Sequence, residues 1–216
     1  SGDTGTQAGG WFRKEINTVA DLKGLRFRTP GLGGQVWAKL GASVTNLAAG
    51  QIFQALQAGT LDAAEFVGPY NDLALGFYQI AENYYSPSFI EPGLATEAVV
   101  NKSKYKALPA DLQEIIRTAC QAEYDQVACD IFANDPRALD TLVDKHGVKV
   151  HMFSDEILAA GAKASLEVLT TVRNSDNALA KKTAESFIAG LNLLRQRAEI
   201  TDSPYLRARE KFFKLK

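Results

Sequence analysis

Alternating apolar and polar side chains mark a strand in the first part of the chain. Residues 25–28 read Leu-Arg-Phe-Arg, so the two apolar side chains share one face, and Thr29-Pro30-Gly31 break the pattern. The alternation predicts a half-buried strand that carries Arg28 at its carboxyl end, beside a glycine-rich turn. Ligands bind at that edge in open α/β sheets, and a guanidinium there can hold a carboxylate through two parallel hydrogen bonds. The alternative is a surface arginine that pairs with a nearby acid.

The same reading predicts further strands and helices up to Val67. We expect a short helix at Gln35–Leu40, a strand at Ala42–Leu47, a helix at Ala49–Ala58 and a third strand at Leu61–Val67. Gly68-Pro69 then breaks the chain. Three strands that alternate with helices indicate a mostly parallel sheet with right-handed crossovers.

Outside this region the pattern is mixed. Ser1–Gly10 is polar and glycine-rich, which predicts an exposed connection. The later elements are expected as follows: a helix at Pro69–Ala81, a loop or edge strand at 84–93, a strand at Leu94–Asn101, a long helix from 108–111 towards Asp135 that Pro136 interrupts or restarts, a strand at Gly147–Phe153, a helix after Ser154 and a helix from about Asp176 to Leu194. The tail after Ser203-Pro204 is unusually apolar, so we expect it to pack on its own domain or on a second copy.

Composition narrows the class of protein. The chain has 216 residues, 24 basic and 25 acidic, and a formal charge of -1, which argues against nucleic-acid partners and against a polybasic membrane patch. No apolar run approaches the length of about 18 residues that spans a bilayer. The chain is therefore cytoplasmic, or a targeting signal has been removed. Cys120 and Cys129 are nine residues apart on a predicted helix, too far to form a disulfide with each other, which argues weakly against an oxidising compartment.

Motifs of common enzyme classes are missing from the sequence. His146 and His151 have no cysteine or carboxylate at metal-ligand spacing, and we interpret them as surface histidines. Neither cysteine has the surroundings of a nucleophile. The glycines at 31, 33 and 34 do not fit a dinucleotide-binding pattern, because position 36 is valine, and no Walker lysine follows.

Polar residues at strand ends and in rigid loops remain as candidates. Glu65 ends the third predicted strand, Glu91 lies in the proline-bounded loop Ile90-Glu91-Pro92-Gly93, and Gln7 lies in the glycine-rich opening segment. A buried carboxylate needs a cation partner. Arg28 is one candidate, and a hard metal ion held by oxygen ligands is another. The alternative is that both glutamates are solvated or paired locally.

Three ordered segments carry a resemblance to a known family. Residues 16–28, Leu40-Gly41-Ala42 and residues 54–65 resemble the solute-binding receptors of tripartite ATP-independent periplasmic (TRAP) transporters, the DctP family, in order and in spacing. Residues 7–16 and 67–72, and Glu91-Pro92-Gly93, further resemble its α-keto-acid-binding subgroup. The resemblance extends along almost the whole chain.

The resemblance implies an α/β fold of the periplasmic solute-binding-protein-like (type II-like) class. This fold has a mixed sheet with flanking helices, a long inter-lobe helix and a C-terminal helical extension. In the subgroup, the arginine that matches Arg28 clamps the substrate carboxylate. Gln7, Glu65, Glu91 and the backbone carbonyl of Phe66 match the groups that surround Na⁺ or Ca²⁺, and this ion also touches the ligand, so Gln7, Phe66 and Glu91 are expected near the substrate as well. The subgroup usually has tryptophan at the position of Phe66, which leaves the size of the ligand open.

The resemblance also implies a function and a domain organisation. We expect a non-enzymatic periplasmic receptor that binds a small organic acid, such as the 2-oxo acid pyruvate, by lobe closure and passes it to TRAP permease subunits. A homodimer through a swapped C-terminal segment is expected in the subgroup. The predicted parts are 1–68, a lobe with the ligand arginine; 69–105, a crossover to the other lobe; 106–200, the long helix and remaining α/β elements; and 201–216, the tail. Ser1 matches the middle of such a receptor, so we expect this chain alone to bind a keto acid poorly or not at all.

Two other functions remain open from the residues alone. One is a cytoplasmic α/β enzyme that acts on a carboxylate with Mg²⁺ or Ca²⁺ held by Glu65 and Glu91. The other is a sensory ligand-binding module on the same fold.

Overall fold

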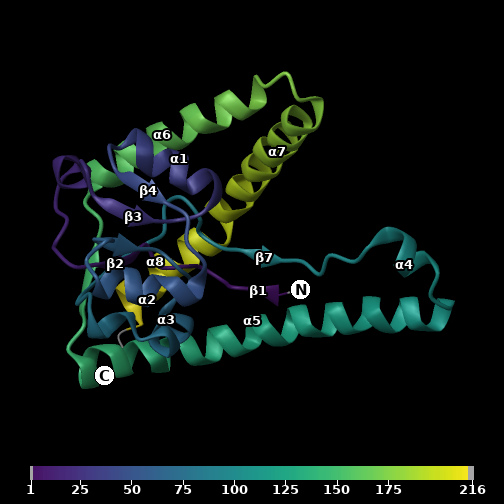
Figure 1. The fold of residues 1–216 in the computed structure, drawn as a ribbon, viewed down its shortest axis with the longest axis horizontal. Coiled ribbons are helices and arrows are strands. Elements are labelled where there is room, and N and C mark those ends of the chain that lie inside the picture. Colours follow the sequence, from purple (N-terminus) through teal and green to yellow (C-terminus); the bar gives the residue numbers. More distant parts are fainter. Residues whose placement is uncertain (1, 214–216) are drawn as a thin grey trace. The chain divides into compact units, whose positions relative to one another are not determined.

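The computed structural model describes residues 2–213, which form a mixed α/β fold (Figure 1). The chain divides into two compact units, one ending at Ser165 and the other beginning at Leu166. In chain order the elements are β1 (Gly2–Asp3), β2 (Gly10–Phe12), the 3-10 helix η1 (Val19–Leu22), β3 (Arg26–Arg28), α1 (Gly31–Lys39), β4 (Ser43–Thr45), α2 (Ala49–Gln57), β5 (Ala63–Ala64), α3 (Pro69–Leu75), the 3-10 helix η2 (Phe77–Gln79), β6 (Asn83–Ser86), β7 (Ala95–Thr96), α4 (Lys102–Lys106), α5 (Ala110–His146), β8 (Lys149–Met152), α6 (Asp155–Arg173), α7 (Ala178–Ile200) and α8 (Asp202–Phe212).

A six-stranded sheet in the order β4-β3-β5-β2-β6-β8 forms the centre of the first unit. The predicted parallel series is confirmed, because β3 pairs parallel with both β4 and β5, with Phe27 opposite Val44 and Ala63. Strand β2 pairs antiparallel with β5 and β6, which makes the sheet mixed. A separate two-stranded ribbon joins β1 to β7.

The expectation of an exposed opening segment is wrong. Residues 7–10 are buried, and strand β2 begins at Gly10. Gly10 has a φ of 122°, and a Cβ atom there would lie 2.7 Å from the carbonyl oxygen of Ala64. Glycine is therefore needed for close approach between two strands rather than for flexibility.

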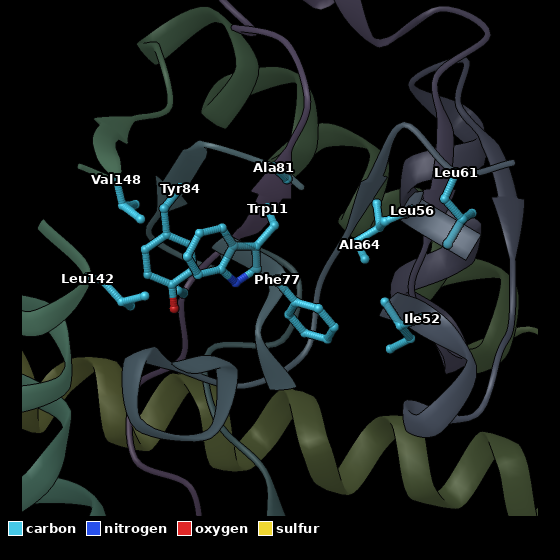
Figure 2. Close-up of a cluster of buried hydrophobic side chains, with 11 residues drawn as sticks. Trp11, Ile52, Leu56, Leu61, Ala64, Phe77, Ala81, Tyr84, Leu142 and Val148 are labelled. Carbon is cyan, nitrogen blue, oxygen red and sulfur yellow. The ribbon is translucent and has the colours of Figure 1, made fainter. Parts of the chain in front are cut away.

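Strand β2 divides the core into two layers. Trp11 and Phe12 are adjacent in the strand and both are fully buried, so their side chains point to opposite faces of the sheet. Trp11 stacks on Tyr84 with ring centroids 4.3 Å apart, in a cluster that includes Ile52 of α2 and Leu142 of α5 (Figure 2). On the other face, Phe12 contacts the rings of Phe27, Trp37, Tyr85 and Phe153. Both faces of the sheet are thus covered.

Several boundaries differ from those predicted. Gly31–Gly34 forms the first turn of α1 instead of a loop, and the third strand is only Ala63–Ala64. Strand β6 lies between β2 and β8, so it is neither a loop nor an edge strand. Helix α5 continues through Pro136 without a break. Proline costs about 3 kcal/mol within a helix, and burial of Ala138 and Leu142 just beyond it offsets that cost.

The second unit, which begins within α6, is helical. Helix α7 ends at Ile200, and α8 begins at Asp202 with Pro204 in its first turn, where the missing N–H needs no partner. The expected packing of the apolar tail on its own domain is not found in the described residues up to 213, because Tyr205, Phe212 and Phe213 are exposed. Packing of the tail on a second copy stays a prediction, as do the four parts proposed from the sequence. Among the helices of residues 2–213, none combines the length and apolar composition required to cross a membrane.

Candidate anion and cation site

Arg28 is the first component of the candidate site. It ends β3 and is only 8% exposed. Its Nε donates to the carbonyl oxygen of Leu47 at 3.0 Å, and its Nη1 donates to that of Glu65 at 2.7 Å. The interpretation as a surface arginine paired with an acid fits Arg26 instead, which forms an exposed ion pair with Asp62. Arg28 is therefore a fixed, buried cation held largely by neutral carbonyl groups.

Glu65 lies directly beside this cation. Its side chain is 2% exposed, and its Oε2 lies 3.9 Å from Arg28 Nη1. Thr29 Oγ1 donates to the same oxygen at 3.3 Å. Burial and the negative charge of Glu91 raise the pKa of Glu65 to about 8, and the attraction of Arg28 only partly opposes them. At pH 7 this raised pKa favours the protonated, neutral form of Glu65 in the folded chain.

Gln7 and Glu91 come together through backbone contacts. The N–H of Gln7 donates to the carbonyl oxygen of Pro92 at 3.0 Å, and the N–H of Ser88 donates to the carbonyl oxygen of Gln7 at 3.2 Å. The loop that carries Glu91 therefore lies against Gln7. Burial lowers the pKa of Arg28, whereas the charges of Glu65 and then Glu91 raise it, so Glu91 acts on the same guanidinium. Gln7 thus adjoins the loop of Glu91, Arg28 adjoins Glu65, and the charge of Glu91 acts on the pKa of both Arg28 and Glu65.

These residues fit a hard cation. Gln7 is 3% exposed, and its Oε1 accepts no hydrogen bond within residues 2–213, although its Nε2 donates to Thr4 Oγ1 at 2.8 Å. A buried acceptor without a donor suits a cation, as does a buried carboxyl group such as Glu65. Over the described part of the chain no three His, Cys, Asp or Glu residues cluster as a metal site. The predicted set contains only two acids, because its other oxygens come from Gln7 and from the backbone of Phe66.

Phe66 adds an aromatic surface. Its ring centroid lies 5.8 Å from Cζ of Arg28. The same ring lines a surface cavity of about 350 Å³ together with Tyr70, Asn71, Ala74 and Leu75. Phe66 therefore lies near the guanidinium and also borders a cavity beside α3.

The two histidines lie outside the candidate site. His146 is exposed and stacks on Tyr78 with centroids 4.0 Å apart. His151 is half-buried rather than at the surface, because its ring stacks on Tyr85 and its Nε2 lies 3.0 Å from Asn83 Oδ1. Both rings have structural contacts, and only His146 fits the expectation of a surface histidine.

Sequence reasoning missed two buried polar residues beside the candidate set. Thr29 is 1% exposed and donates to Glu65. Asp72 is also 1% exposed, and burial raises its pKa to about 7 against the opposing effect of its hydrogen bonds. The sequence gives no sign that Asp72 is buried, because an acid in the first turn of a helix that begins at Pro69 is usually exposed to solvent.

Comparison with known proteins gives the family. Residues 2–175 match the model for the bacterial extracellular solute-binding protein family 7, DctP. The chain belongs to this family. The match confirms the predicted family and the prediction of a solute-binding protein rather than an enzyme. A monocarboxylate 2-oxoacid-binding periplasmic protein of Nostoc sp. is 42% identical over 178 residues, which are 82% of this DctP chain and 49% of that protein. The chain thus spans about half the length of this curated relative.

Two solved structures share the fold. A TRAP periplasmic solute binding protein from Colwellia psychrerythraea, with bound calcium and pyruvate, has a TM-score of 0.89 and 37% identity, with 95% of this chain and 62% of that chain covered. A second, from Pseudoalteromonas atlantica with bound sodium and pyruvate, has a TM-score of 0.86 and 38% identity, with 96% and 63% covered. The predicted fold class is confirmed.

Proposed function

We propose that this DctP chain provides the anion- and cation-binding side of a receptor for a small 2-oxo acid such as pyruvate. The observation that carries the proposal is the buried Arg28 beside the buried Glu65, with the buried, unpaired Oε1 of Gln7 in the segment whose Ala8 bonds to Val67. The calcium, sodium and pyruvate bound in the two solved relatives support it.

Each residue has a role in this proposal. The guanidinium of Arg28 binds the ligand carboxylate, and its two backbone acceptors fix its direction before the ligand arrives. Gln7 Oε1, the carboxylates of Glu65 and Glu91 and the carbonyl oxygen of Phe66 would hold Ca²⁺ or Na⁺. That cation would supply positive charge that favours the ionised form of Glu65, offsets the charges of both acids fully as Ca²⁺ or partly as Na⁺, and attracts the oxygens of a 2-oxo acid. The phenyl ring of Phe66 forms one wall for the ligand.

We extend the proposal from this chain to a complete receptor of the DctP family. We place the receptor in the periplasm, where it closes around its ligand and delivers it to TRAP permease subunits in the membrane. The periplasmic relative of Nostoc sp. and the family match support this placement. We also propose a homodimer through the C-terminal segment, on the basis of the apolar residues in 201–216.

Saturation-transfer NMR on the 216-residue chain tests the proposal, because the method detects binding even when it is weak. We expect signal transfer to pyruvate in the presence of Ca²⁺ or Na⁺, and loss of the signal in Arg28→Lys, since lysine cannot form two parallel hydrogen bonds to a carboxylate. Arg26→Lys is the matched control at the exposed start of the same strand and should bind normally. Equal transfer in Arg28→Lys and in the parent, or conversion of pyruvate into another product, would contradict the proposed function.

A further inference from the structure

The segment that joins β5 to α3 presents two of the proposed ligand groups without regular structure of its own. Glu65 and Phe66 lie here, and the next residue, Val67, belongs to neither a strand nor a helix. Both backbone groups of Val67 are nevertheless bonded. Its carbonyl oxygen accepts from the N–H of Ala8 at 3.0 Å, and its own N–H donates to Asp72 Oδ1 at 3.3 Å. Val67 therefore ties this segment to two other parts of the unit.

Asp72 is in turn held by the core. Its Oδ2 accepts from Trp11 Nε1 at 2.9 Å and from the hydroxyl of Tyr84 at 3.1 Å. Trp11 belongs to β2 and Tyr84 to β6, and their rings stack in the buried cluster (Figure 2). Three donors thus use both oxygens of the carboxyl group, so Oδ1 has a fixed position from which to hold Val67.

A second acid fixes the start of α3. The N–H of Tyr70 donates to Asp135 Oδ1 of α5 at 2.9 Å. A Cβ atom at Gly68 would lie 3.1 Å from Asp135 Oδ2, so the chain passes close to this side chain. Residues 67–70 are therefore held from the core and from α5 at once.

We propose that Asp72 is a positioning residue for the binding site, because it sets through Val67 where Glu65 and Phe66 place their oxygens. The carbonyl oxygen of Val67 accepts a hydrogen bond from Ala8, the neighbour of Gln7. The same contact therefore also sets the position of Gln7 relative to Glu65 and Phe66. This inference rests on the proposed function for its consequence in binding. Its structural part, the hold on Val67, is independent of any ligand.

The test uses Asp72→Ala, because an alanine side chain has no oxygen atom that could accept a hydrogen bond from the Val67 N–H. We expect its Ca²⁺ affinity, measured by calorimetry on the full chain, to fall about tenfold or more, as is typical when an outer partner of a metal ligand is lost. Tyr84→Phe is the matched control, because it removes a donor to the same carboxyl group but leaves the bond between Val67 and Oδ1. This control should retain Ca²⁺ affinity within about twofold.

Amide hydrogen exchange separates this inference from the proposed function. In the unchanged chain the Val67 amide should exchange slowly although it lies outside all strands and helices. In Asp72→Ala, amide exchange should become faster selectively at residues 65–68. A rapidly exchanging Val67 amide in the unchanged chain overturns the inference, whether or not Asp72→Ala folds. Parental Ca²⁺ affinity in a folded Asp72→Ala also overturns it. A chain that binds neither Ca²⁺ nor pyruvate, but whose Val67 is protected by Asp72, refutes the proposed function and leaves the hold on Val67 established.

Discussion

Replacement of Glu65 by glutamine should stabilise the chain while it removes a cation ligand. The pKa of Glu65 rises from its usual 4.5 to about 8 in the folded chain, chiefly because the carboxyl group is buried. Because Glu65 binds its proton more tightly in the folded chain, its contribution to the free energy of unfolding is fully present below pH 4.5. That contribution is lost progressively as the pH increases from about 4.5 to about 8. At pH 7 the unfolded chain ionises Glu65 and the folded chain does not, so the loss amounts to about 3 kcal/mol. Glutamine resembles the protonated carboxyl group and avoids this loss.

Urea unfolding in the absence of divalent ions measures the effect. Tryptophan fluorescence reports the first unit specifically, because both tryptophans, Trp11 and Trp37, lie in it. We expect Glu65→Gln to exceed the parent in free energy of unfolding by about 3 kcal/mol at pH 7 and by about 1 kcal/mol or less at pH 5. Glu82→Gln is the control, because Glu82 forms an exposed ion pair with Lys149 and should give little difference at either pH.

The result that refutes this reasoning is a difference that does not change between pH 5 and pH 8. Such a result would mean that Arg28, 3.9 Å from Glu65, keeps the carboxylate ionised in the folded chain despite its burial. A lower stability of Glu65→Gln at pH 7 would lead to the same conclusion, because the variant would then have lost a favourable ion pair.

Two further predictions concern the same region. Gly10→Ala should lower the free energy of unfolding by several kcal/mol in urea titrations, because its Cβ would lie 2.7 Å from a backbone oxygen. The control Gly24→Ala, also at positive φ but in open space, should lower it by about 1 kcal/mol, and equal effects of the two variants would contradict the close approach at Gly10. Binding of Ca²⁺ at pH 7 should release about one proton as Glu65 ionises, which calorimetry in buffers of different ionisation enthalpy can measure; no release at pH 7 would show that Glu65 is already charged.

Much of the sheet was predictable because its signals are local. The alternation at 25–28 and the helical spacing of Ile52 and Leu56 were enough to predict a parallel series of strands. Strand β2 was missed because three residues, Gly-Trp-Phe, are too few to show a period, and its partners lie more than fifty residues away along the chain. The continuity of α5 through Pro136 also depends on tertiary packing, which overrides the local preference.

The candidate site was predictable only in part, for a related reason. Arg28 and Glu65 stand at strand ends, where sequence patterns can place them, and the structure brings them together. Asp72 carries no comparable signal, because its partner Trp11 is 61 residues away and its burial depends on the assembled sheet. The roles of Arg28, Gln7, Glu65, Phe66 and Glu91 in binding stay predictions, and their testing requires the measurements above.

The place of β2 in the sheet also bears on the order of folding. Residues 10–12 sit between β5 and β6 and pair with residues 63–64 and 83–85, so the first strand of this sheet in the chain is the one that closes its middle. Until β2 docks, the parallel group β4-β3-β5 and the pair β6-β8 have no hydrogen bonds to each other within this sheet. Pairing between segments so far apart in the chain carries a high loop-closure cost. We therefore expect β2 to insert in a late and slow folding step that joins the group β4-β3-β5 to the pair β6-β8. Removal of residues 1–12 would therefore leave a split sheet rather than a shorter one.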